Sequence, residues 1–119
     1  MSRKKQKTAA APQKTHHVYV IELPIAVAQD RKFREQNPNY TEGQICLYVG
    51  RTGLSPEERF EQHSTKHKKA AKPCKKYGVI KLRPDLYEGL NPMSYDDSLV
   101  KEPEHAQALR EKGFGVWQN

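Results

Sequence analysis

The chain has 119 residues, a net charge of +7 and 35% hydrophobic residues. This length suits one domain with a modest core rather than two domains. The sequence shows no secretory signal pattern, no apolar run long enough to cross a membrane and only two cysteines, Cys46 and Cys74, which excludes the secreted disulfide-rich and membrane-spanning classes and favours a cytoplasmic protein.

The charge is unevenly distributed along the chain. Residues 1–84 contain 18 Lys and Arg against 7 Asp and Glu, whereas residues 85–119 contain 3 against 7. The first 15 residues have five bases, no acid and no large branched or aromatic side chain, so they are predicted to be a disordered basic tail. The domain is expected over residues 16–119, with its basic front half suited to a polyanion.

The first half of the domain predicts two strands separated by a polar segment. Residues 17–23 are rich in β-branched and aromatic side chains and end before a proline, which is typical of a strand. Residues 24–44 form a polar excursion in which Phe33 would anchor a short helix over residues 26–36. Residues 45–50 predict the second strand, which ends at a glycine.

A helix is then expected from Pro56 to His67. Ser55 is a favourable N-cap, Pro56 suits the first helical position, and Glu58 completes a capping box. The lysine-rich segment that follows contains Pro73, which is expected to stop any helical pattern there.

The last part of the chain predicts one more strand and one more helical segment. Residues 79–83 alternate between apolar and basic side chains, which indicates a third strand. A helical pattern runs over residues 94–112, where Pro103 predicts either a kink or a division into two helices, and Gly113 is placed to end it. Residues 114–117 are expected to pack back onto the core. The predicted fold class is therefore α/β, with a small, partly antiparallel three-stranded sheet flanked by helices.

One group of residues carries recognisable chemistry. The second strand contains Tyr48-Val49-Gly50, and the helix after it carries Arg59 and His63 four positions apart, on one helical face. This group resembles the GIY-YIG nuclease family, with Tyr48-Val49-Gly50 in the place of Tyr-Ile-Gly. His17-Val18-Tyr19 stands in the place of Gly-Ile-Tyr, although a histidine replaces the first glycine. Tyr48 follows Tyr19 by 29 positions, which makes residues 24–44 an insertion in this interpretation.

The resemblance implies a metal-dependent endonuclease that hydrolyses DNA phosphodiester bonds. It implies that Tyr19 activates or positions water, that Arg59 stabilises charge on the phosphoryl group, and that one Mg²⁺ or Mn²⁺ ion is bound by a glutamate of the last helix. Both Glu102 and Glu104 are candidates for that glutamate, and Glu102 is preferred because it shares a helical face with apolar side chains. The candidate catalytic residues are Tyr19, Tyr48, Arg59, His63 and Glu102, with Glu102 as the metal ligand.

A second set of residues is expected to hold the DNA backbone without reading bases. These are Arg51, Lys66, Lys68, Lys69, Lys72, Lys75 and Lys76. Because no separate DNA-binding domain fits in a chain of this length, a protein partner is expected to supply any sequence specificity.

Alternative interpretations remain open at this level. Each tyrosine can be a packing residue of a strand, and the charged side chains can be solvated surface groups. The same fold can act as a non-catalytic nucleic-acid-binding module, and residues 24–44 can dock a protein partner instead. A zinc site that uses Cys46, His63, His67 and Cys74 fits no known ligand spacing.

Overall fold

A four-stranded mixed sheet forms the centre of the α/β domain. The computed structural model describes residues 13–119, so residues 1–12 of the expected basic tail lie outside the described residues. The strand order is β3-β1-β2-β4. The strands are β1 (His17–Leu23), β2 (Cys46–Thr52), β3 (Lys81–Leu82) and β4 (Gly115–Trp117).

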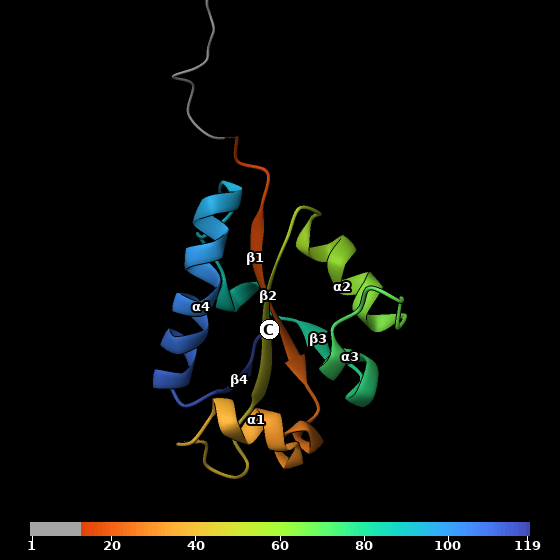
Figure 1. Cartoon of the computed structure of the whole chain (residues 1–119), viewed down its shortest axis with the longest axis vertical. Coiled ribbons are helices and arrows are strands. Elements are labelled where there is room, and N and C mark those ends of the chain that lie inside the picture. The colour runs from red at the N-terminus through yellow and green to blue at the C-terminus, as the bar shows by residue number, and fades with distance from the viewer. Residues whose placement is uncertain (1–12) are drawn as a thin grey trace, which may run out of the picture.

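Helices cover both faces of this sheet. Figure 1 shows α4 on one face and α2 with α3 on the other, while α1 lies at the end of the sheet near β4. The α-helices are α1 (Arg31–Gln36), α2 (Pro56–Ser64), α3 (Lys72–Tyr77) and α4 (Tyr95–Glu111). Two 3₁₀ helices, η1 (Ile25–Gln29) and η2 (Pro84–Leu86), complete the set. Within residues 13–119, none of these helices has the length and apolar character needed to span a membrane.

The predicted sheet lacked one strand. Residues 114–117 were expected only to pack on the core, but β4 pairs parallel with β2, with Trp117 beside Tyr48. Gly113 adopts a positive φ of 101°, as expected of a residue that ends a helix, and it turns the chain from α4 towards β2. Three residues are too few to show a strand pattern, so only the long-range pairing reveals this strand.

Local signals fixed several element ends correctly. The first strand spans the residues predicted for it, and Ser55 and Glu58 form both hydrogen bonds of the predicted capping box.

Three other predicted elements have different bounds in the structure. The predicted helix over residues 26–36 is divided into η1 and α1, because Asp30 adopts an extended conformation and caps α1. The helix expected to reach His67 ends at Ser64, and the third strand contains two residues instead of five.

Two prolines, Pro73 and Pro103, lie within helices of the structure. Pro73 was expected to stop a helix, but it lies in the first turn of α3, where a proline loses no helical hydrogen bond. Pro103 lies inside α4, which continues as one helix of 17 residues rather than as two helices. The carbonyl that Pro103 leaves without a helical partner belongs to Leu99.

Side-chain amides pair with the sheet backbone along β4 and at the part of β1 that β3 does not cover. At β4, the Asn37 amide accepts a bond from the Val116 N–H and donates one to the Val116 carbonyl, at 2.8 and 2.9 Å. Gln36 pairs with the Gln118 backbone in the same way. At β1, the Asn91 amide pairs with both backbone groups of Val18. The 24–44 segment therefore acts in place of a neighbouring strand and covers the β4 edge.

Replacement of Asn37 by alanine should destabilise the domain by about 2 kcal/mol, because the buried Val116 N–H loses its acceptor, whereas the Val116 carbonyl keeps the bond from Arg110. Urea unfolding followed by circular dichroism measures this change. Asn39→Ala is the matched control, since Asn39 is exposed in the same loop. Equal free energies of unfolding for the two variants would contradict the role assigned to Asn37.

Candidate functional site

Three aromatic side chains meet on the face of the sheet that α2 and α3 cover. The Tyr19 hydroxyl lies 2.9 Å from His63 Nε2, and the Tyr48 ring centroid lies 5.5 Å from that of His63 and 6.1 Å from that of Tyr19. Tyr19 and His63 have no exposed surface, and Tyr48 is 2% exposed. These three residues, from β1, β2 and α2, are called the tyrosine–histidine cluster.

Gly50 makes this arrangement sterically feasible. It lies directly opposite Tyr19 in the β1–β2 pairing, so the Tyr19 ring crosses over it. A Cβ atom at Gly50 would lie 2.5 Å from the Tyr19 hydroxyl oxygen and 2.9 Å from Tyr48 Cε2. Both distances are well below van der Waals contact, so a side chain at this position would displace the tyrosines.

The hydrogen bonds of His63 define the position of its proton. The Ala71 backbone N–H donates to His63 Nδ1 at 3.1 Å, so Nδ1 must carry the lone pair. Burial and the charge of Arg59 lower the pKa of His63 to about 4, so the ring is neutral at pH 7. The proton therefore resides on Nε2, which donates it to the Tyr19 hydroxyl oxygen. The hydroxyl proton of Tyr19 remains free for a different acceptor.

Burial keeps both tyrosines protonated. It raises the pKa of Tyr19 to about 12, although the nearby charge of Arg59 acts in the opposite direction. It also raises the pKa of Tyr48, and the negative charge of Glu102 adds to that rise. At neutral pH neither phenol is ionised in this conformation, so neither acts as a general base and both act as hydrogen-bonding and packing groups.

Arg59 places a positive charge beside the cluster without a counter-charge. Its side chain is half-buried, and its Nη1 donates to Gln62 Oε1 at 2.7 Å. Among residues 13–119, no carboxylate lies within ion-pair distance of this guanidinium. Its charge lowers the pKa of both Tyr19 and His63. A guanidinium in this state has donors available for an anion such as a phosphate.

Glu102 lies on the other side of the sheet. Alternation along β2 directs Arg51 towards the face opposite to that of Tyr48, and Arg51 Nε lies 3.1 Å from Glu102 Oε1. The Nε–H group is not aligned for a hydrogen bond with any acceptor in the described residues, so the contact is an ion pair. Burial raises the pKa of Glu102 and the charge of Arg51 opposes that rise. Thus Tyr19, Tyr48, His63 and Arg59 lie together on the α2–α3 side of the sheet, whereas Glu102 lies on the α4 side.

The residues present fit a metal ion only in a limited way. Within residues 13–119 no three or more His, Cys, Asp or Glu side chains gather where they could hold an ion. Glu102 offers one carboxylate, with its side chain 11% exposed and its pKa raised by burial, so a nearby cation would stabilise its charged form. Mg²⁺ commonly takes one or two carboxylates and completes its shell with water and phosphate oxygens, which suits this single ligand.

The alternative ligand Glu104 is exposed and pairs with Lys101 at 2.6 Å. The six predicted DNA-contacting lysines are all exposed, in and around the α2–α3 connection. Two of them already have contacts, since Lys76 pairs with Asp30 and Lys75 donates to the Lys68 carbonyl. The remaining ammonium groups form a solvated basic surface on the α2–α3 side of the sheet.

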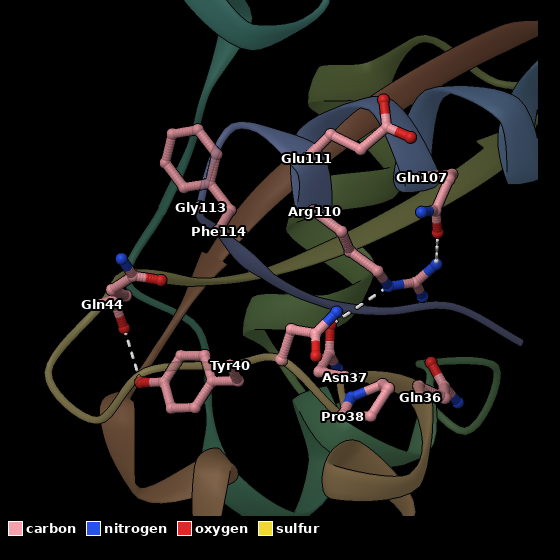
Figure 2. A pocket seen from close by; sticks show the side chains of 11 residues that line it. Gln36, Asn37, Pro38, Tyr40, Gln44, Gln107, Arg110, Glu111, Gly113 and Phe114 are labelled. Atoms are coloured by element: carbon pink, nitrogen blue, oxygen red, sulfur yellow. Dashed lines mark hydrogen bonds between the residues drawn. The ribbon is translucent and has the colours of Figure 1, made fainter.

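Two cavities within residues 13–119 lie away from this site. A cavity of about 200 Å³ is lined by α1, the loop after it and the end of α4, and it contains none of the predicted site residues. Figure 2 shows Arg110 at this cavity, hydrogen-bonded to Asn37 and Gln107. Arg110 also donates to the Val116 carbonyl, so it holds the 24–44 segment to β4 and α4. A larger hollow of about 580 Å³ lies over the same segment.

Sequence reasoning missed several parts of the site. The Ala71 backbone group and Gln62 position His63 and Arg59, but neither belongs to a motif. The exposed Tyr95, whose ring lies under Arg51, was also missed. Its only sequence signal is an aromatic side chain directly after the N-cap Ser94, where a polar residue is more usual.

Comparison with known proteins found no matching family model, no matching curated protein and no matching solved structure. The interpretation of the site therefore depends on its own geometry. That geometry offers an unpaired guanidinium, a neutral imidazole that donates through Nε2, two protonated phenols and one carboxylate paired with an arginine.

Replacement of Gly50 by alanine should force the Tyr19 ring away from His63 and lower the free energy of unfolding by about 2 kcal/mol, a typical cost of overpacking. Chemical denaturation measures the stability. Gly53→Ala is the control, because a Cβ atom there would lie 3.5 Å from its nearest neighbour, an ordinary contact. If both alanine variants are as stable as the wild type, the close approach described for Gly50 is wrong.

Protonation of His63 should make the domain acid-sensitive. Between pH 6.5 and about 4 the unfolded chain binds a proton on His63 that the folded chain does not bind, so stability falls as the pH falls through this window. The loss attributable to His63 should approach about 3 kcal/mol at pH 4, and it should be absent above pH 7. The stability difference between wild type and His63→Gln, followed against pH, isolates it from the carboxylates. A constant difference from pH 7 to 4 would disprove the neutral, buried histidine.

Proposed function

We propose that this chain is a metal-dependent endonuclease that hydrolyses DNA phosphodiester bonds at a GIY-YIG-like site. The observation that carries the proposal is the half-buried Arg59 guanidinium, which lacks a carboxylate partner among the described residues and lies beside the tyrosine–histidine cluster. Phosphodiester hydrolysis needs such a group, because negative charge grows on the phosphoryl oxygens in the transition state. A solely structural arginine would more often be paired with a carboxylate.

The basic side chains bind and orient the DNA in this proposal. Arg59 donates two parallel hydrogen bonds to the phosphate oxygens of the bond to be cleaved. The exposed lysines around α3 hold the flanking backbone, which gives affinity without sequence specificity. Specificity for particular sites is then assigned to a protein partner.

Tyr19 and His63 act as positioning residues. The His63 Nε2–H bond fixes the Tyr19 hydroxyl, whose own proton can be donated to a water or a phosphate oxygen. Because burial raises the pKa of Tyr19 to about 12, it orients a water molecule rather than removing its proton. Both side chains are fully buried, so α2 must move outward before substrate reaches them. Catalytic hydrogen bonds often form fully only in the substrate complex.

Glu102 is the proposed metal ligand. A divalent ion held by its carboxylate, by water and by substrate phosphate would polarise the phosphoryl group and the leaving oxygen. Arg51 has to release Glu102 for this to occur. The poor alignment of the Arg51 Nε–H group with Glu102 makes this release less costly, since no well-formed hydrogen bond is lost.

A non-catalytic nucleic-acid-binding module is the second candidate. It is favoured by the complete burial of Tyr19 and His63 and by the ion pair that occupies Glu102. In that case the basic surface retains its role and the cluster is only structural. Binding that weakens steeply with salt, together with no cleavage in Mg²⁺ or Mn²⁺, would favour this function.

Purified protein should nick supercoiled plasmid DNA in Mg²⁺ or Mn²⁺ but not in EDTA. Glu102→Gln should reduce the rate by about a hundredfold or more, because it removes the charge that holds the ion. Arg59→Ala should cause a similar loss. Agarose-gel assays of the nicked product measure these rates.

Glu104→Gln is the matched control for Glu102→Gln. It removes an equivalent carboxylate two positions away on the same helix, and Glu104 is exposed and paired only with Lys101. Its nicking rate should equal that of the wild type. Wild-type protein that binds plasmid without nicking it under any divalent metal would refute the endonuclease and leave the binding module.

A further inference from the structure

An exposed tyrosine lies next to the proposed site at the end of the sheet where β1 begins and β2 ends. Tyr95 is the first residue of α4 and is 49% exposed. The Arg51 guanidinium lies 5.7 Å from the Tyr95 ring centroid, over the ring. His16 contacts the same ring edge-on, with centroids 5.1 Å apart and planes at 73°. These three residues are called the Tyr95 platform.

The platform is held rigidly by the backbone around it. His16 forms two backbone hydrogen bonds with Met93, both of 2.8 Å, just before the N-cap of α4. Ser94 caps the helix by accepting a bond from the Asp97 N–H. The aromatic ring is therefore fixed at its base, whereas half of its surface faces solvent. A large exposed aromatic ring on a fixed backbone loses little conformational entropy when it contacts a ligand.

Arg51 links the platform to the proposed metal ligand. The same guanidinium lies over the Tyr95 ring and pairs with Glu102 through Nε at 3.1 Å. A flat group stacked on Tyr95 would therefore lie one side chain away from Glu102. If that group is the base of a nucleotide, its own phosphate falls within reach of Arg51.

The charges around Tyr95 discriminate between paired and unpaired DNA. Asp96 and Asp97 follow it directly in the first turn of α4, and both are exposed. These carboxylates repel a continuous line of phosphates, so a duplex backbone is disfavoured along this helix start. A base carries no charge and presents a π-face that stacks on tyrosine, which is the usual way in which single strands are bound. Within a duplex the flat faces of the bases are already stacked on one another.

We propose that the Tyr95 platform stacks an unpaired nucleotide base, so that the preferred DNA contains a single-stranded segment at the cleavage site. This inference rests on the proposed endonuclease function and names its substrate class. Tyr95 acts as a binding residue that determines substrate preference. It holds one unpaired nucleotide with its phosphate within reach of Arg51.

Fluorescence anisotropy of the full chain tests this inference in EDTA, where no cleavage occurs. The probes are a labelled, short mixed-sequence single strand and a blunt duplex of the same sequence. Tyr95→Ala should weaken single-strand binding about tenfold and leave duplex binding nearly unchanged. Tyr95→Phe should retain wild-type affinity because it keeps the stacking ring. Val100→Ala, which truncates a 64% exposed side chain on the same helix, is the control.

The outcomes separate this inference from the proposed function. Unchanged single-strand binding in Tyr95→Ala, or an equal loss for both probes, would overturn the stacking platform while plasmid nicking still stood. A selective loss of single-strand binding in a protein that never cleaves DNA would support the platform and reject the endonuclease. If the wild-type chain binds neither probe at low salt, both proposals are wrong.

Discussion

The Tyr19 ring lies across Gly50 and is held there by the Nε2–H group of His63, and the rest of the site depends on this contact. The hydrogen bond joins β1 to α2 through the interior, and α2 in turn positions Arg59. The contact requires a missing side chain on β2, a neutral imidazole and a donor to Nδ1 from Ala71. Loss of any one of these moves α2 relative to the sheet.

The candidate chemistry is distributed over both faces of one sheet. The phenols, the imidazole and Arg59 lie on the side of α2 and α3, whereas Glu102 lies on the side of α4. Arg51 contacts both Glu102 and Tyr95. It therefore links the α4 side of the sheet to the end of the sheet where β2 stops. In the proposed mechanism one phosphate has to reach both Arg59 and Glu102 around the end of the sheet.

Local patterns predicted much of this arrangement, and long-range contacts account for what they missed. The capping box that begins α2 and the i, i+4 spacing of Arg59 and His63 depend on neighbouring residues, so the sequence alone revealed them. The hydrogen bond from the Ala71 N–H to His63 joins α2 to the segment that follows it, and no local sequence pattern predicts this bond. Parallel pairing placed β4 beside β2, and a proline interpreted as a helix stop begins α3. Residues of the site were therefore easier to name than their exposure or their partners.

The central claim is that Glu102 and the end of β2 bind a divalent ion together with a phosphate. Paramagnetic broadening by Mn²⁺ in ¹H–¹⁵N spectra, recorded with a bound single-stranded oligonucleotide, tests it most directly. The account predicts selective loss of the amide signals around Glu102 and around Gly50 and Arg51, and recovery of these signals in Glu102→Gln. Broadening that is centred on the exposed Asp96–Asp97 pair instead, or that persists unchanged in Glu102→Gln, would contradict it.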